Sequence, residues 1–331
     1  MDTFELLKTI NETPGPSGFE HDIATVIREI WEPLVNESQI DRVGSLIGIK
    51  HGREPHQKGD QARRRILLAA HMDELGLMVS NVLEHNGWGY LRVTNLGGVD
   101  VRQLYNQRVV VHGRKNLPGL LGAIPGWMLP DKKQGHAYDY ETLVVDTGLP
   151  YEMVKKTVSV GDAVSFQQSL RKLQNGRVAG KALDNRASVT AVTICLEHLQ
   201  TRQHEWDVIA VATCQEETRL LGAATTAHTY QPDIAIAIDV TFGNGPGATD
   251  YRTFKLGDGP VVSTAPDVHP GVSAAIKKAA KEIEMSTQHE YAPRGGGTDA
   301  YYMQIARAGI PTAVVSIPLR YMHTMVESVS L

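Results

Sequence analysis

Five short segments of the sequence place a histidine or a carboxylate where a buried strand is predicted to end or where the following turn begins. In an open α/β sheet the carboxyl ends of the strands form the crevice in which ligands bind, so residues far apart along the chain can meet there. We therefore expect these segments to converge. The residues are His71 and Asp73 in AAHMDELG, Asp184 in GKALDNRAS, Glu216 and Glu217 in ATCQEETRLLGA, Asp239 in AIAIDVTFG, and His323 in RYMHTMVES.

Carboxylates beside buried strands predict a positively charged partner. Asp239 directly follows the apolar run 234–238, and a carboxylate is almost never buried unless it is paired or bound to a cation. The neighbours of these carboxylates are mostly apolar, Thr or Gln, and Asp184 has an arginine close by, Arg186. Two histidines and several carboxylates without a thiolate are typical of Zn²⁺, Co²⁺ or Mn²⁺ sites. The sequence therefore predicts bound divalent cations.

The adjacent residues Glu216 and Glu217 are predicted to have different roles, because successive side chains at a strand end or turn can point in different directions. One could bind metal while the other takes a proton from a water molecule and returns it to the leaving amine. Asp184 has two carboxylate oxygens and could bridge two cations. Together these residues indicate metal-assisted hydrolysis.

Each element also has a simpler structural interpretation. An isolated histidine can be an ordinary structural residue, and a pair of glutamates often forms a solvated face. Asp184 could cap a helix, and Asp239 could stabilise a turn. The glycine run Gly295–Gly297 lacks the spacing of nucleotide-binding loops. It permits close backbone approach by a peptide substrate or a neighbouring subunit, and Thr298 or Asp299 could cap the helix that follows.

The elements that must position these residues change in type along the chain. Apolar residues recur at helical spacing over 19–35, and short alternating runs separated by Gly, Asn and Pro fill 76–173. We predict a mixed-sheet α/β catalytic domain with helices on both faces, formed by 1–75 and 174–331, that is interrupted by a small all-β domain, 76–173. The expected helices after this insert span 184–200, 219–228, 271–284 and 299–307, and the expected strands of the α/β part span 65–70, 206–213, 233–239, 260–264, 286–291 and 311–317.

Composition and charge exclude several classes of partner. The 331 residues include 33 Lys and Arg against 37 Asp and Glu, a net charge of −4 without a basic stripe, so we expect no nucleic-acid partner. No apolar run reaches the ~18 residues that a membrane helix needs, and the polar start of the chain lacks the regions of a signal peptide. We expect a cytoplasmic protein that does not bind membranes. The two cysteines are too few for a disulfide framework.

The ordered segments HMDELGLMV, GKALDNRAS, QEETRLLGA, DVTFG and GGGTDA closely resemble the tetrahedral (TET) aminopeptidases, the family of glutamyl and deblocking aminopeptidases. The resemblance spans nearly the whole chain and implies that the insert is a dimerisation domain. It also implies short peptide substrates, two divalent ions per subunit and a homo-oligomer, typically a tetrahedral dodecamer. Carried over residue by residue, it implies that His71 and Asp239 bind one ion, that Glu217 and His323 bind the other, that Asp184 bridges them, that Glu216 is the general base, and that Asp73 orients His71.

The sequence departs from the pattern of this family in three places. Thr218-Arg219-Leu220-Leu221 stands where relatives usually have Val-Gly-Leu-Arg, and Thr324 follows His323 where Ser-Pro is more common. The sequence ends at Leu331, where relatives generally continue into a last helix, so we expect apolar surface to be exposed there. These departures motivate one alternative, a catalytically silent peptide-binding or assembly homologue.

A second alternative is a glycoside hydrolase, since close relatives are sometimes labelled endoglucanase. Two carboxylates could in principle hydrolyse a glycosidic bond. That chemistry gives no reason for the histidines, and a sugar groove favours more aromatic surface than a 6% aromatic content provides. The sequence therefore favours the metal-dependent aminopeptidase.

Overall fold

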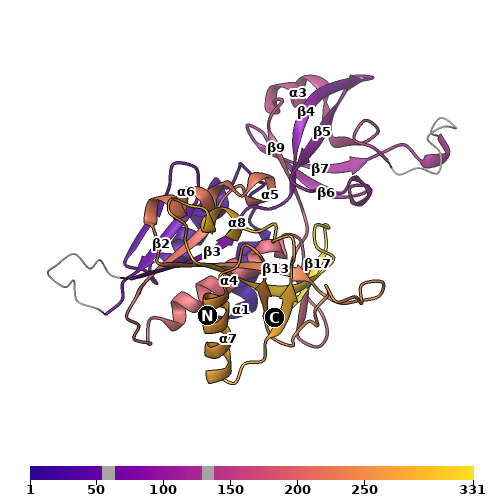
Figure 1. Cartoon of the computed structure of the whole chain (residues 1–331). Helices are drawn as coiled ribbons and strands as arrows, with labels where there is room; N and C mark the ends of the chain where they lie inside the picture. Colours follow the sequence, from indigo (N-terminus) through magenta and orange to yellow (C-terminus); the bar gives the residue numbers. More distant parts are fainter. Residues whose placement is uncertain (54–63, 129–137) are drawn as a thin grey trace.

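A large mixed sheet and a smaller closed barrel organise the chain (Figure 1). The computed structural model describes residues 1–53, 64–128 and 138–331. Within these ranges, eleven strands form the sheet and six form the barrel. The expected mixed α/β fold with a large sheet is confirmed. None of the helices in the described ranges is both long and apolar enough to span a membrane.

Four parallel strands form the centre of the large sheet. They are ordered β12, β3, β13 and β16, and each pairs in parallel with its neighbour. Parallel strands that lie side by side end at the same edge of the sheet, so this edge brings together the turns that follow them. The four strands are β12 (Asp207–Thr213), β3 (Arg65–His71), β13 (Ile234–Phe242) and β16 (Thr312–Arg320).

Shorter strands complete the sheet on both sides of this centre. On one side β2 pairs antiparallel with β12 and carries β1, and on the other side β17, β11 and β10 follow β16. A separate parallel pair, β14 and β15, joins the sheet through β16. Their bounds are β1 (Glu37–Ile40), β2 (Leu46–Lys50), β10 (Arg171–Lys172), β11 (Arg177–Gly180), β14 (Val261–Thr264), β15 (Gln288–Tyr291) and β17 (Glu327–Ser330).

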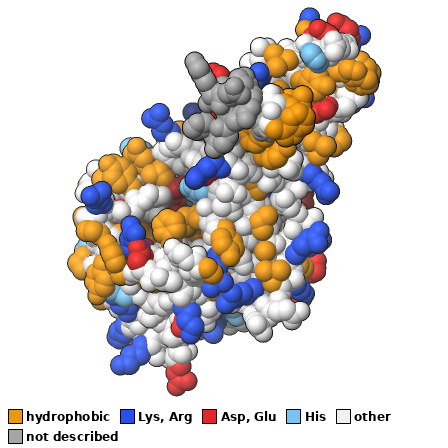
Figure 2. All heavy atoms as spheres, turned by 90° about the vertical axis from the view of Figure 1, so that its right-hand side faces the viewer, with side chains coloured by type: hydrophobic (Ala, Val, Ile, Leu, Met, Phe, Trp, Pro, Cys, Tyr) orange, Lys and Arg blue, Asp and Glu red, His pale blue; other side chains and the backbone are white. Residues whose placement is uncertain are grey.

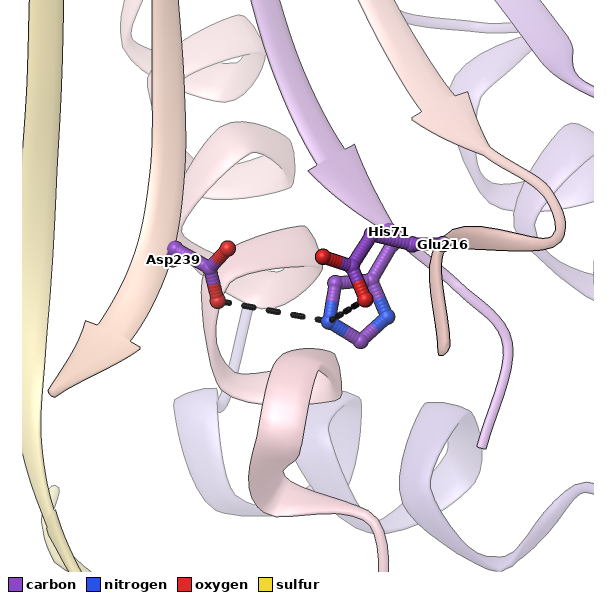
Figure 3. Close-up of side chains that lie close together, drawn as sticks. All are labelled: His71, Glu216 and Asp239. Atoms are coloured by element: carbon purple, nitrogen blue, oxygen red, sulfur yellow. Dashed lines mark ion pairs between the residues drawn. The ribbon is translucent and has the colours of Figure 1, made fainter. Parts of the chain in front are cut away.

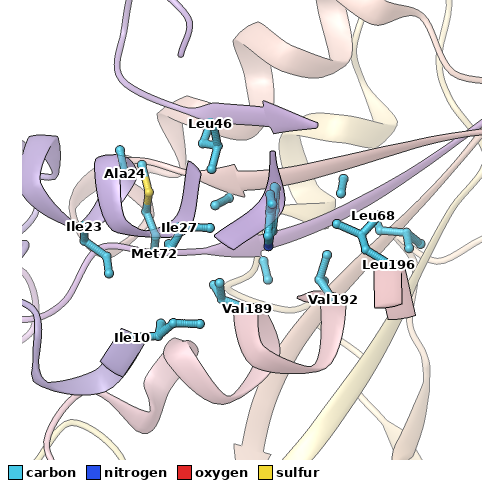
Figure 4. Packing of buried hydrophobic residues seen from close by; sticks show 14 of the residues in the cluster. Ile10, Ile23, Ala24, Ile27, Leu46, Leu68, Met72, Val189, Val192 and Leu196 are labelled. Atoms are coloured by element: carbon cyan, nitrogen blue, oxygen red, sulfur yellow. The ribbon is translucent and has the colours of Figure 1, made fainter. Parts of the chain in front are cut away.

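Helices cover both faces of the sheet because successive residues of its central strands point to opposite faces. Leu68 and Ala70 of β3 join a core with α1, α2 and α4 (Figure 4), whereas Leu67 and Ala69 join a second core with α6, α7 and α8. Both cores are closely packed around apolar side chains. The helices are α1 (Thr3–Glu12), α2 (His21–Trp31), α4 (Leu183–His198), α5 (Glu216–Arg219), α6 (Leu221–Tyr230), α7 (Pro270–Glu282) and α8 (Ala300–Gln304).

The barrel closes in the order β4, β5, β8, β7, β6, β9 and has an apolar core of its own. Its sequence segment also contains the helix α3 and two short 3-10 helices, so the expected all-β character is wrong in this detail. Val154 of α3 is fully buried in the barrel core, which explains why a helix belongs to this unit. The bounds are β4 (Gly76–His85), β5 (Trp88–Leu96), η1 (Val101–Gln103), β6 (Arg108–His112), β7 (Asn116–Gly122), η2 (Gly126–Met128), β8 (Val144–Pro150), α3 (Tyr151–Thr157) and β9 (Ala163–Phe166).

Several elements near the site differ in length from the sequence prediction, and β13 and α8 show why. Strand β13 continues to Phe242, three residues beyond 239, because its pairing with β16 extends to Phe242 and Leu319. Helix α8 ends at Gln304 instead of 307 because the backbone N–H of Ile310 turns back to bind the carbonyl of Gln304. Both differences arise from backbone hydrogen bonds that the local sequence pattern does not predict.

Candidate metal centre

The centre of the site lies at the carboxyl edge of the parallel strands (Figure 3). His71 is the last residue of β3, and Glu216 begins α5 just after β12. Because Thr213 at the end of β12 pairs with His71, the two chain segments deliver their side chains to one place. Asp239 also reaches this place, but from inside β13, so its predicted position at a strand end is wrong. The predicted convergence of the segments is nevertheless what the structure shows.

Three carboxylates surround the imidazole of His71, which is almost completely buried. Its Nε2 atom lies 3.1 Å from Oδ1 of Asp184 and 3.6 Å from Oε2 of Glu216. The same atom lies 4.0 Å from Oδ1 of Asp239. One face of the cluster therefore combines one imidazole with oxygens from three separate elements.

His323 faces the other side of Asp184. Its Nε2 atom lies 3.4 Å from Oδ2 of Asp184 and 3.7 Å from Oε2 of Glu217. Asp184 thus presents one oxygen to each histidine, which is the arrangement expected of a bridging carboxylate. The His323 side chain is 44% exposed whereas that of His71 is 2% exposed, so the cluster opens to solvent on the His323 side.

Burial and mutual repulsion disfavour the charged forms of most of these carboxyls. Burial, partly offset by His71, raises the pKa of Glu216 to about 10. Burial also raises the pKa of Asp239 to about 8, and burial together with Asp184 holds the pKa of Glu217 well above its usual value. Asp184 differs, since hydrogen bonds with both histidines outweigh its burial and lower its pKa.

This environment fits divalent cations. Two triads, His71 with Glu216 and Asp239, and His71 with Asp184 and Glu217, each bring their ligand atoms within 4.8 Å of one another. In the described ranges no Lys or Arg lies within ion-pair distance of these carboxylates. Oε1 of Glu217 is buried without a hydrogen-bond partner, and such an atom is costly unless something positive binds it.

Asp73 supports the cluster from behind. Its two oxygens accept the backbone N–H groups of Glu216 at 3.1 Å and Glu217 at 3.0 Å. Oδ1 of Asp73 also lies 3.5 Å from Nδ1 of His71, on the opposite side of the ring from Asp184. Asp73 therefore contacts Glu216, Glu217 and His71. The sequence led us to expect a contact with His71 alone.

Glu327 is a supporting carboxylate that sequence reasoning missed. It begins β17, is buried, and accepts the backbone N–H groups of Asp184 at 2.9 Å and His323 at 3.0 Å. These bonds tie two distant site segments together. Burial of Glu327 raises its pKa well above the usual value, and the negative charge of Asp184 raises it further. Its position between apolar Val326 and Val329 was a signal that could have identified it.

The barrel unit also reaches the site through the segment that follows β5. A Cβ atom on Gly98 would lie 3.1 Å from Nδ1 of His323, so a side chain at this position would press on the imidazole. Gly97, with φ +78°, lies against Glu217 in the same way. The two glycines allow close backbone approach to the imidazole of His323 and to Cβ and the backbone carbonyl of Glu217.

A cavity of about 350 Å³ opens beside the cluster and is bordered by the glycine run Gly295–Gly297. The glycine run therefore lies at the wall of the site. Asp299 follows it but makes no capping bond to α8, contrary to one of the two caps expected from the sequence. Its carboxylate instead accepts a hydrogen bond from the hydroxyl of Thr213 at 2.5 Å.

Comparison with known proteins assigns the chain to a family. The sequence model of the M42 glutamyl aminopeptidase family matches residues 52–331 of the chain. The chain belongs to the M42 glutamyl aminopeptidase family. The resemblance seen in the sequence is thereby confirmed, and so is the expected class of enzyme, a peptidase that hydrolyses N-terminal peptide bonds.

Individual aminopeptidases and peptidases match this chain over nearly their full length. A lysyl aminopeptidase of Pyrococcus furiosus is 35% identical over 332 residues, covering 99% of this chain and 92% of the relative. A TET aminopeptidase from the archaeon Thaumarchaeota archaeon SCGC AB-539-E09 has a TM-score of 0.91 at 31% identity, with 100% and 93% of the two chains covered. The TET1 peptidase of Pyrococcus horikoshii, described as assembling into a tetrahedron or a large octahedral shell, has a TM-score of 0.84 at 29% identity, with 99% and 94% covered.

Proposed function

We propose that this M42 aminopeptidase binds two divalent ions, Zn²⁺ or Co²⁺ with Mn²⁺ as a further candidate, and removes N-terminal residues from short peptides. The observation that carries the proposal is Asp184, whose two oxygens face two different histidines. A carboxylate in that position can bridge two ions. His71 and Asp239 would hold one ion, and Glu217 and His323 the other.

Glu216 is the proposed general base. When bound, the ions supply Lewis acidity, which makes a water molecule more acidic and polarises the peptide carbonyl. Nearby bound cations would favour the ionised form of Glu216, whose carboxylate then takes the proton of that water and returns it to the leaving amine. Its carboxylate lies next to His71, and its backbone N–H is bound by Asp73. Asp73 is therefore proposed to position the base and to orient His71 at the same time.

We further propose that the barrel is an inserted dimerisation domain. All its strands fall within the proposed insert 76–173, and the proposed catalytic domain consists of 1–75 and 174–331. Hydrophobic side chains are visible on the upper part of the surface in Figure 2. The proposed insert contains the exposed residues Leu120 of β7 and Trp127 and Met128 of η2, of which Trp127 is 77% exposed. Exposed apolar patches of this kind mark interaction surfaces. Pairing of two barrels would be the first step towards a tetrahedral dodecamer.

Metal removal and restoration test the proposed chemistry. Aminoacyl p-nitroanilide reporters should be hydrolysed by metal-loaded protein, not after dialysis against a chelator, and again after addition of Zn²⁺ or Co²⁺. Elemental analysis of the same samples should find two ions per subunit at full activity. Hydrolysis that is unchanged in chelated protein, or release of reducing sugar from cellulose by it, would contradict the proposal. Metal-loaded protein that hydrolyses no reporter would indicate the silent homologue.

A further inference from the structure

Two carboxylates outside the metal cluster, Glu290 and Asp267, border the same cavity as His71 and His323. From their placement we propose that this cavity receives the side chain of the substrate's first residue and selects a basic one, lysine or arginine, with Glu290 as the specificity-determining residue. The inference rests on the proposed aminopeptidase function. It adds a class of substrate that the cluster alone does not specify.

Glu290 is held in a fixed orientation by two hydroxyl groups. Oγ1 of Thr241 donates to its Oε1 atom at 3.0 Å, and Oγ of Ser263 donates to its Oε2 atom at 2.7 Å. An ionised carboxylate has about four acceptor positions, so two hydroxyl donors leave room for a ligand. Because both partners are neutral, the negative charge of Glu290 stays uncompensated and available to an ammonium or guanidinium group.

Asp267 adds a second negative charge to the cavity. It is 6% exposed, its Oδ2 atom accepts the backbone N–H of Gly296 at 3.2 Å, and its Oδ1 atom is buried without a partner. Gly295 has φ +81°, and a Cβ there would lie 3.1 Å from Oδ2 of Asp267, so the glycine run is needed to bring this backbone onto the carboxylate. Because buried polar atoms nearly always have a hydrogen-bond partner, we expect a bound ligand to donate to Oδ1 of Asp267.

No positive side chain of the described part competes for these two carboxylates. The residues that border the cavity include neither Lys nor Arg, and no ion pair joins Glu290 or Asp267 to a Lys or Arg of 1–53, 64–128 or 138–331. Ala265, Val268 and Val314 supply apolar wall between the polar groups. Apolar walls that end at a carboxylate suit the methylene stem and charged head of lysine or arginine.

The position of Glu290 along the strand distinguishes a side-chain contact from an amino-terminus contact. Asp239 of the cluster and Thr241 both lie on β13 and point to the same face, about 6.6 Å apart at ~3.3 Å per residue. Glu290 lies one hydrogen bond beyond Thr241. The α-amino group sits next to the scissile bond and hence next to the cluster, so Glu290 is too distant for it. The far end of a long side chain can reach Glu290.

The first test measures the substrate preference of the unaltered protein. Metal-loaded full-length protein is assayed with Lys, Arg, Leu, Ala and Glu p-nitroanilides, and kcat/KM for Lys and Arg should exceed that for Leu by at least roughly tenfold, with Glu slowest. Faster hydrolysis of Leu or Glu would overturn the inference while leaving the aminopeptidase function intact. Hydrolysis of no reporter would overturn the proposed function and this inference with it.

The second test removes the charge of Glu290. Glu290→Gln should lower kcat/KM for the Lys reporter by roughly 10- to 100-fold, the range of a hydrogen bond to a charged group, and change the Leu reporter by less than about threefold. Glu284→Gln, an exposed carboxylate outside the cavity, is the matched control and should change neither. An equal loss on both reporters would show that Glu290 only supports the fold, and it would overturn the assignment.

A third measurement needs no variant and therefore does not depend on folding of Glu290→Gln. L-lysine and L-norleucine carry the same four-carbon chain and differ in the terminal ammonium group. L-lysine should inhibit hydrolysis of the Leu reporter at about tenfold lower concentration than L-norleucine does. Equal inhibition by the two amino acids would overturn the inference.

Discussion

Two groups of buried carboxylates lie next to each other in this protein and differ in how the protein satisfies them. Asp73 and Glu327, behind the cluster, each accept two backbone N–H groups. Glu217, within the cluster, leaves Oε1 without a partner, and burial raises the pKa of Glu216 and Glu217. We infer that the carboxylates saturated by backbone donors hold the site in shape and that those left without donors are the ones that bind the proposed cations. The difference between supporting and reacting carboxylates can be tested.

The largest effect should come from the proposed base. Glu216→Gln keeps the size of the side chain but cannot take up a proton from water, so kcat should fall by about 10²- to 10⁴-fold. Metal content, measured by elemental analysis, should stay at the level of the unaltered protein. Full retention of kcat would show that another residue is the general base. Glu216 would then no longer differ in role from the supporting carboxylates.

Metal binding to the cluster should stabilise the folded protein. Zn²⁺ that is free at 100 times its dissociation constant adds about 2.7 kcal/mol to the free energy of unfolding, because it binds carboxylates that otherwise repel one another. Thermal unfolding with and without Zn²⁺ measures the shift. Asp184→Asn should lose most of the zinc-dependent part, since Asp184 contacts both histidines. A shift that is the same in this variant would mean that the ions bind elsewhere.

Removing a supporting carboxylate should weaken metal binding without abolishing chemistry. In Asp73→Asn one of the two backbone N–H groups, of Glu216 or Glu217, loses its acceptor. Zinc affinity should fall by roughly 10- to 100-fold, as measured by competition with a chromophoric chelator. Excess Zn²⁺ should restore much of the activity here but not in Glu216→Gln. If excess Zn²⁺ restores nothing, Asp73 takes part in the reaction itself.

The smallest effect should come from a carboxylate that belongs to neither group. Glu282 lies on the surface of α7, 3.8 Å from Lys278, and both side chains are well exposed. Glu282→Gln should change the free energy of unfolding by less than about 0.5 kcal/mol and leave kcat and zinc affinity unaltered. Denaturant unfolding and the reporter assay provide the check. A larger change would mean that substitution of any carboxylate perturbs this protein.

Regular elements with a strong local pattern could be predicted from the sequence. Helix α4 and strands β3 and β12 match their expected ranges within about two residues, because a long helical segment and two continuous apolar runs identify them. The short strands β14 and β15 were also predicted, but β17 at the end of the chain was not. Strand β17 has only four residues and exists because it pairs with both β16 and β11. Glu327 was missed for that reason.

The sequence by itself determined the kinds of ligand and the segments that carry them, since carboxylates and histidines beside buried strands restrict the chemistry to a few classes. Only the tertiary structure decided which oxygen of Asp184 faces which histidine and that Glu290 borders the same cavity as His71. The physical reason is that a side chain's position along its own strand is a local property. Its neighbours across the sheet depend on pairing between segments that can lie more than a hundred residues apart, as for β3 with β12 and with β13.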